Sequence, residues 1–193
     1  PEGPIARMLR DPRWHMEYGD GRRTLAKEET LYDIIEADAI LPESSHSGLL
    51  YSAEFLETVR RRLAPGGLYI QWVPTARATQ TFNAVFPHAL LLMPAGVMIG
   101  SNDPIPFNAE ALAARFAAPE TSAHLRQGNA GFDGWAGMFS EAPLRWMPGQ
   151  RRDDAALTDV FPRDEFYLNN PTTTANEYVR ALRAAATRRA SVD

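Results

Sequence analysis

The chain has 193 residues, enough for one domain with its own core, and its 45% hydrophobic and 23% charged residues are typical of a folded protein. It contains no cysteine, which excludes disulfides, thiolate metal sites and a cysteine nucleophile. The net charge of −4 disfavours a general nucleic-acid binder and suits a cationic ligand.

The first forty residues predict a strand, a helix and a second strand. Residues 14–18 alternate loosely and end at a Gly-Asp-Gly turn, which indicates a short strand. Residues 22–29 predict a short helix. Residues 32–39 are largely apolar, as expected of a parallel strand covered on both faces. Residues 40–50 carry a proline, three serines and a glycine, and predict a loop.

The next segment predicts a strand–helix–strand crossover. Ser52 is a good N-cap for a helix that runs to Leu63 with one apolar stripe. A Pro-Gly-Gly turn at 65–67 ends that helix, and residues 68–73 form a second buried strand. Because parallel strands need such a crossover, this pattern predicts a right-handed βαβ unit in a parallel sheet.

The rest of the chain is predicted to close the same domain. Residues 75–85 predict a helix, and residues 89–93 and 96–101 an antiparallel hairpin. Asn108 caps a short helix that ends at Phe116, and the last helix spans about 175–188. Residues 119–150 are less regular and loop-rich, with a short helix. No repeat or linker divides the chain, so 1–193 is predicted to be a single α/β domain.

Two acids stand where ligands bind in such folds, beyond the carboxyl ends of parallel strands. Asp38 ends the strand at 32–39, where it could hold an amine or a ribose hydroxyl, or cap the loop. Alternation places Ile34, Glu36 and Asp38 on one face; Glu36 lies deeper, where we expect it to have a structural partner. Asp20 stands between two glycines that let the backbone approach a flat ring, although an ordinary Asp-Gly turn has the same pattern.

Other chemistries have little support in the sequence. The four histidines are far apart and form no H-x-x-x-H pair, so we predict no metal site. The serines beside His46 lack a G-x-S-x-G elbow, which disfavours a serine hydrolase. The apolar stretch 89–100 is too short to span a bilayer, contains Pro94, and no signal peptide is visible; we therefore expect a cytoplasmic protein with neither nucleic-acid nor membrane partners.

Several motifs in order make the chain resemble the spermidine synthases, the polyamine aminopropyltransferase family, over roughly residues 11–105. The motifs are GDGR at 19–22, YDIIEAD at 32–38, LYSAEF at 50–55, LAPGG at 63–67, and Gln71. A weaker similarity to the family's C-terminal acidic motif lies at Leu157, Thr158, Asp159 and Pro162.

The resemblance implies a class I methyltransferase-like, Rossmann-like fold and a polyamine-biosynthesis transferase. Its co-substrate would be decarboxylated S-adenosylmethionine, whose aminopropyl group is moved to a small-molecule amine without a metal. In this family, Asp20 and Gly21 would contact the adenine, and the loop containing Pro42 would cover the nucleoside. Asp38 would orient and deprotonate the amine. Tyr51 and Gln71 are the candidate substrate-binding residues.

Three departures leave alternatives open. Leu41 stands where the family has a second acid that grips the polyamine, and Val160 and Phe161 replace the usual charged residues of the C-terminal motif. Residues 1–13 contain no G-x-G-x-G pattern, and the acid that holds the ribose is absent. We therefore expect a sheet that lacks the family's first two strands, as in a truncated fragment or a homodimer that covers the exposed edge. The alternatives are a non-catalytic nucleoside-binding or dimerisation relative, and a methyltransferase that uses ordinary S-adenosylmethionine.

Overall fold

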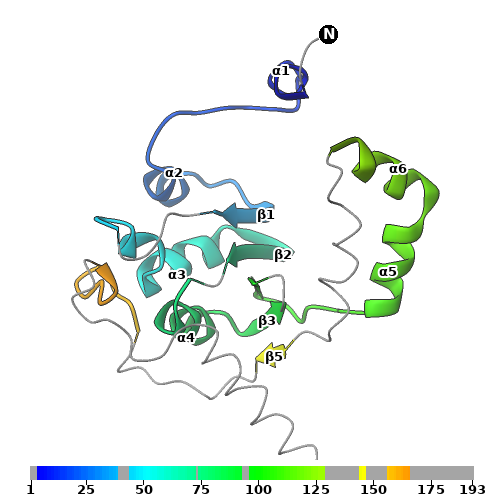
Figure 1. Cartoon of the computed structure of the whole chain (residues 1–193). Coiled ribbons are helices and arrows are strands. Elements are labelled where there is room, and N and C mark those ends of the chain that lie inside the picture. The colour runs from blue at the N-terminus through cyan, green and yellow to red at the C-terminus, as the bar shows by residue number, and fades with distance from the viewer. Residues whose placement is uncertain are drawn as a thin grey trace, which may run out of the picture.

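The computed structural model describes residues 4–38, 44–72, 74–92, 96–128, 144–146 and 156–165, which build a five-stranded sheet with helices around it (Figure 1). The strand order is β1-β2-β4-β3-β5. The strands are β1 (Tyr32–Ala37), β2 (Leu63–Trp72), β3 (His88–Leu92), β4 (Val97–Ser101) and β5 (Leu144–Trp146). β1 and β2 are parallel and the other neighbours antiparallel, which confirms the predicted partial Rossmann-like α/β fold.

The crossover between β1 and β2 is the helix that the sequence predicts. α3 (Ala53–Arg61) is capped by Ser52, whose Oγ accepts the N–H of Phe55 at 3.2 Å. Its stripe of Phe55, Leu56 and Val59 is buried against the sheet. The helix ends two residues before the predicted Leu63. β2 begins at Leu63 and includes residues 65–67, which were predicted to form a turn before a strand at 68–73. Ala37 of β1 pairs with Gln71 of β2. This βαβ unit fixes the carboxyl end of β1 beside the start of α3.

An aromatic cluster forms the centre of the core. α4 (Ala76–Val85) is capped by Thr75 and packs beside α3. Its Phe82 is fully buried between Tyr69 of β2 and Phe86, with ring centroids 5.8 Å and 4.6 Å away, respectively. Gly100 of β4 has to be glycine at this point, because a Cβ there would lie 2.5 Å from the Phe86 ring.

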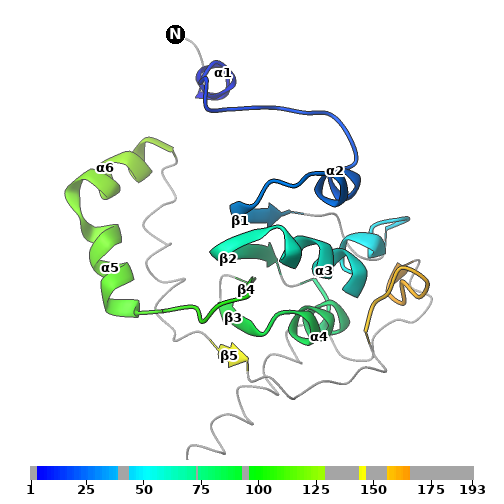
Figure 2. The ribbon, with the colours of Figure 1, turned by 180° about the vertical axis from the view of Figure 1, so that it is seen from behind.

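The N-terminal segment departs from the prediction. Residues 14–18 form no strand; they run as extended chain from α1 (Pro4–Leu9), a helix that the sequence did not predict, to α2 (Gly21–Lys27), which it did. α1 stands away from the sheet in both views (Figures 1 and 2). A strand needs a neighbour that accepts its hydrogen bonds, and the prediction for 14–18 was wrong because none of the described strands pairs with this segment.

β1 is the edge strand of the sheet, as expected if strands are missing on that side. Ile34 is 60% exposed, so the face of β1 that carries Ile34, Glu36 and Asp38 is uncovered among the described residues. The expected apolar exposure at this strand is therefore confirmed.

The second half of the chain adds two helices and one short strand to the fold. α5 (Ala109–Ala117) is capped by Asn108 as predicted, and α6 (Pro119–Gly128) is the short helix expected within 119–150. β5 was not predicted; its three residues pair with β3. The expected helix at 175–188 lies outside the described residues. In the part of the chain that is described, no helix is long and apolar enough to cross a membrane.

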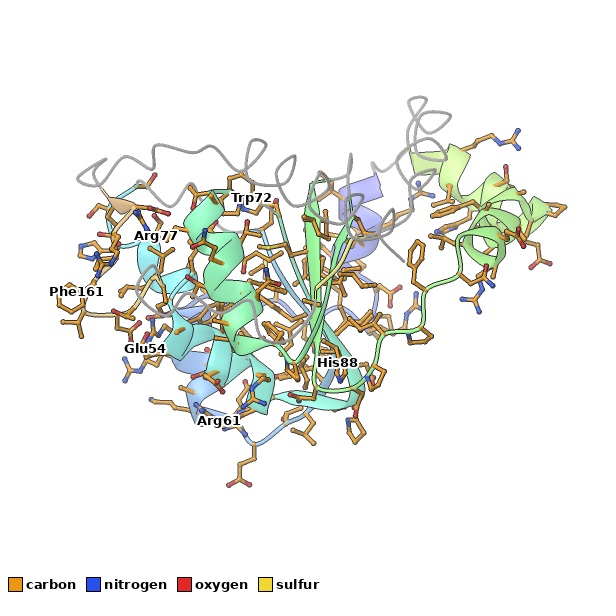
Figure 3. All side chains as sticks on the ribbon, turned by 90° about the horizontal axis from the view of Figure 1, so that it is seen from below. Glu54, Arg61, Trp72, Arg77, His88 and Phe161 are labelled. Atoms are coloured by element: carbon orange, nitrogen blue, oxygen red, sulfur yellow. The ribbon has the colours of Figure 1, made fainter. Side chains whose placement is uncertain are left out.

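Residues 156–165 return to the α3–α4 side of the sheet, and Figure 3 shows Phe161 at the same end of the molecule as Glu54 and Arg77. Leu157 is buried, and its backbone carbonyl accepts the N–H of Ala53 at 2.8 Å. Further along, the buried carboxylate of Asp164 pairs with Arg77 and accepts the hydroxyl of Thr75 at 2.6 Å. This segment is therefore fixed to the first turns of α3 and α4.

Candidate active site

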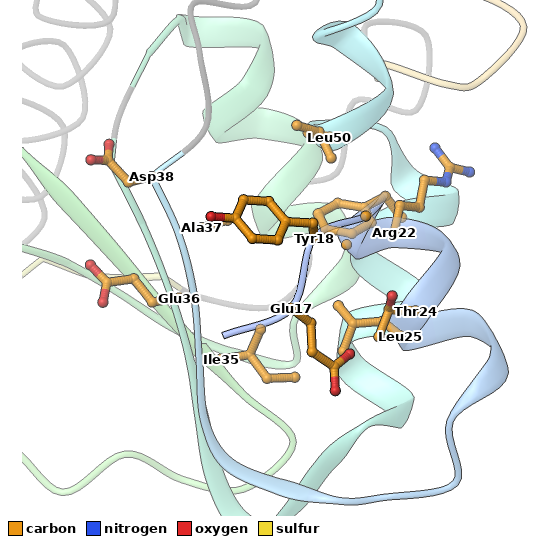
Figure 4. A pocket seen from close by; sticks show the side chains of 13 residues that line it. Glu17, Tyr18, Arg22, Thr24, Leu25, Ile35, Glu36, Ala37, Asp38 and Leu50 are labelled. Atoms are coloured by element: carbon orange, nitrogen blue, oxygen red, sulfur yellow. The ribbon is translucent and has the colours of Figure 1, made fainter. Parts of the chain in front are cut away.

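A pocket of about 480 Å³ lies between α2, β1 and the start of α3 (Figure 4). Its apolar lining includes Leu25, Ile35, Leu50 and Phe55. Its polar lining consists mainly of charged residues and Tyr18, whose side chain is 95% exposed. A hollow of this size with an apolar floor and a few charged groups is typical of a small-molecule site.

Asp38 lines this pocket because it follows β1 directly, at the carboxyl end of a strand that has a parallel neighbour. Its side chain is exposed, and so is that of Glu36, two residues earlier on the same wall. The expectation of a structural partner for Glu36 was wrong. β1 is an edge strand with this face uncovered, so the Glu36 carboxylate reaches solvent and needs no ion pair.

Asp20 is the N-cap of α2 and does not itself line the pocket. Its Oδ1 accepts the N–H groups of Arg22 at 3.0 Å and Arg23 at 3.2 Å, which satisfies two free donors of the helix terminus. Both neighbouring glycines, Gly19 and Gly21, line the pocket. The structure thus brings the Gly-Asp-Gly turn and Asp38 to one cavity.

The pocket is acidic. Three carboxylates line it, those of Glu17, Glu36 and Asp38, and among the described residues no cation forms an ion pair with any of them. In Figure 4, Asp38 and Glu36 lie across the pocket from Arg22, with the Tyr18 ring between the two walls. Closely spaced carboxylates of this kind attract a cationic ligand and repel an anionic one.

Comparisons with known proteins find a family model and a solved structure that are similar to parts of this chain. Residues 3–78, which include α2, β1, α3 and all of the pocket lining, match the spermine/spermidine synthase domain. Over these residues the chain is similar to the spermidine synthases. A probable spermidine synthase of known structure, from Corynebacterium glutamicum ATCC 13032, is 26% identical; the match covers 54% of this chain and 45% of that one, with a TM-score of 0.39. The chain thus spans less than half the length of that relative. No curated protein matches it significantly.

Two further residues singled out in the sequence motifs, Tyr51 and Gln71, also do not line the pocket. Tyr51 is 1% exposed, and its hydroxyl accepts the indole N–H of Trp72 at 3.1 Å. Gln71 is 2% exposed, and its Oε1 accepts the hydroxyl of Tyr69 at 3.0 Å. It stands beside Ala37 in the sheet, one strand away from the pocket wall. Pro42 lies outside the described residues, as does Leu41.

The acidic segment at 157–162 contacts the GDGR motif at 19–22, a pairing that sequence reasoning missed. The Arg22 guanidinium binds both carboxylate oxygens of Asp159 and donates to the carbonyl of Leu49 at 2.8 Å. The N–H of Asp159 in turn donates to the Glu54 carboxylate at 3.0 Å. Residues 137 positions apart in the chain meet here, and only the recurrence of charged residues in both motifs could have suggested this contact.

No group of three or more acidic or histidine side chains in the described segments could hold a metal.

This ion pair gives the stability of the chain a definite pH dependence. The hydrogen bond from Arg22 holds the pKa of the Asp159 carboxyl below its ordinary value of 3.8. Since the folded pKa is the lower one, the pair stabilises the fold above pH 3.8, and this stabilisation is lost as the pH falls through the folded pKa. Urea unfolding at several pH values should therefore show Asp159→Asn less stable than the unaltered chain at neutral pH. The difference should shrink below the ordinary pKa. An unchanged difference down to pH 2 would contradict the assignment.

Proposed function

We propose that this chain carries the active site of an aminopropyltransferase. The enzyme would move the aminopropyl group of decarboxylated S-adenosylmethionine to an amine. The observation that supports it most strongly is the single acidic pocket shared by Asp38 and the Gly19–Gly21 turn. The match of residues 3–78 to the spermine/spermidine synthase domain supports the same reaction class.

The reaction needs a group that aligns the amine and removes a proton from it. The nitrogen attacks the carbon next to the sulfonium sulfur, the carbon–sulfur bond breaks, and its electrons leave the sulfur as a neutral thioether. In our proposal the carboxylate of Asp38 takes the proton that the nitrogen loses as the carbon–nitrogen bond forms. A carboxylate at an exposed strand end can do this without moving far.

The charges of the pocket favour this donor over ordinary S-adenosylmethionine. The decarboxylated donor has a sulfonium and an ammonium group, both positive, and its acceptor is also an ammonium compound. Glu17, Glu36 and Asp38 attract all of these charges, whereas they would repel the carboxylate of ordinary S-adenosylmethionine. A methyltransferase is therefore the weaker candidate.

A non-catalytic nucleoside-binding relative is favoured by one observation. Leu41 occupies the position where spermidine synthases have a second acid, so the chain lacks one of the groups that hold a polyamine. Such a relative would still bind the adenine at the Gly-Asp-Gly turn but would not transfer the aminopropyl group. The transfer rate of an Asp38 variant separates the two candidates.

Calorimetry with methylthioadenosine, the nucleoside product, tests the adenine side of the proposal. Asp20→Asn keeps the acceptor oxygen that caps α2 but places an amide donor where the second carboxylate oxygen would accept from the adenine amine. We expect it to weaken binding about 10- to 100-fold, as for the loss of a hydrogen bond to a charged group. Asp20→Ala should lose at least as much. If only Asp20→Ala weakens binding, Asp20 is merely a helix cap.

A further inference from the structure

Arg22 occupies an unusual position in an acidic pocket. Among the described residues that line the pocket it is the only base, and it stands in the first turn of α2, next to the glycines of the turn. A cation at this place would oppose the binding of a positively charged donor. The contacts of its guanidinium show how that effect is avoided.

The guanidinium is turned out of the pocket. In Figure 4 it points away from Asp38 and Glu36, while the aliphatic part of the side chain lies near the pocket. Its nitrogen atoms bind both oxygens of Asp159, and Nη1 also donates to Leu49 at 2.8 Å and to Ser52 at 3.3 Å. The guanidinium carbon lies 6.0 Å from the centroid of the Phe55 ring.

Asp159 is held in place without help from the pocket. Its N–H donates to the Glu54 carboxylate, and two residues earlier Leu157 is buried between α3 and α4. The N–H of Leu157 donates to the hydroxyl of Thr81 at 2.9 Å, and its carbonyl accepts from Ala53. The segment that carries Asp159 is thus anchored to two helices, so its carboxylate is positioned before Arg22 binds it.

We propose that Asp159 is a specificity-determining residue that neutralises Arg22 and draws its charge out of the pocket, so that the pocket selects cationic over neutral nucleosides. This inference rests on the proposed function. Asp159 touches no ligand itself and acts through Arg22. Without its carboxylate, the guanidinium is an unpaired positive charge at the pocket wall and opposes the attraction of Glu17, Glu36 and Asp38 for a sulfonium.

The experiment compares two ligands that differ in charge, decarboxylated S-adenosylmethionine and neutral methylthioadenosine. With the full chain at low salt, calorimetry should show that Asp159→Asn binds the cationic ligand about five- to tenfold more weakly, the size expected for one unpaired charge in a partly screened site. Affinity for the neutral ligand should change less than about twofold, as expected when no charge acts on it. The loss should diminish at high salt.

Two further variants separate charge from structure. Arg22→Gln combined with Asp159→Asn removes both charges and should restore the affinity for the cationic ligand. Asp164→Asn breaks the neighbouring ion pair with Arg77, on the same segment but away from the pocket, and should leave the ratio of the two affinities unchanged.

The outcomes are distinct. An equal loss for both ligands in Asp159→Asn, or no recovery in the double variant, would mean that Asp159 only fastens its segment, and the inference would be wrong while the proposed function stands. If the unaltered chain binds neither ligand, the proposed function fails and this inference fails with it.

Discussion

Asp38→Asn is expected to lower the rate of aminopropyl transfer about 10²- to 10⁴-fold, the range typical of a lost general base. The amide has the size of the carboxylate but cannot take a proton from the attacking nitrogen. Asp38 lines the pocket at the end of β1, and its exposed side chain leaves room for an amine. The measurement is a single-turnover rate with decarboxylated S-adenosylmethionine and a diamine, which isolates chemistry from product release.

A matched control lies on the same strand. Asp33→Asn makes the same change at an exposed residue of β1 that does not line the pocket, and its rate should stay within about twofold of the unaltered chain, as for a surface change remote from the chemistry. Binding of methylthioadenosine should survive in both variants, because neither residue is proposed to hold the adenine. A normal transfer rate in Asp38→Asn would contradict its role as base and would leave the non-catalytic relative as the better candidate.

Phe82→Ala should lower the free energy of unfolding by about 3–5 kcal/mol, as expected when a buried aromatic side chain is truncated. Phe82 is fully buried on α4, where its ring packs against Tyr69 and Phe86. The surrounding rings belong to β2 and to the end of α4, so they cannot collapse into the space without disturbing the sheet. Urea unfolding monitored by circular dichroism measures the loss.

Phe161→Ala is the control for this variant. It removes the same side chain from an exposed position on the segment 156–165, where the Arg163 guanidinium lies 5.7 Å from the ring centroid. The cost should be below about 0.5 kcal/mol, as for most surface substitutions. Equal losses in the two variants would show that the Tyr69–Phe82–Phe86 cluster is not the centre of the core.

The correct predictions rested on sequence signals from residues that are close together in the chain. The predicted capping residues Ser52 and Asn108 each accept an N–H of the following helix, because a cap depends only on residues two or three positions away. The crossover between β1 and β2 was predictable for a similar reason: apolar strands on either side of an amphipathic helix have few other ways to bury their surfaces. Asp38 lines the pocket at the end of β1, as expected. Asp20 was expected beside it because a strand was predicted at 14–18; that strand does not form, and only the flanking Gly19 and Gly21 line the pocket.

Several failed predictions depended on a neighbour far away in the chain. Residues 14–18 have the alternation of a strand, but no described strand pairs with them. Glu36 was expected to lie deep because the strand at 32–39 was predicted to be covered on both faces, whereas its side chain is exposed. β5 consists of three residues whose structure depends on the edge that β3 offers. None of these features has a local sequence signal strong enough to predict it without knowing which segment lies next to it in the fold.

The sequence by itself determined the βαβ unit, the helices that follow it, the acid at the end of β1 and the similarity to spermidine synthases, because caps, periodicity and motifs are properties of neighbouring residues. Only the tertiary structure decided which charges of the site are paired. Arg22 and Asp159 are separated by 137 positions and meet because segment 156–165 packs onto α3 and α4, whereas Glu17 and Glu36 find no cation among the described residues. Coulomb interactions depend on the distance between charges in space, and this distance cannot be read from their separation along the chain.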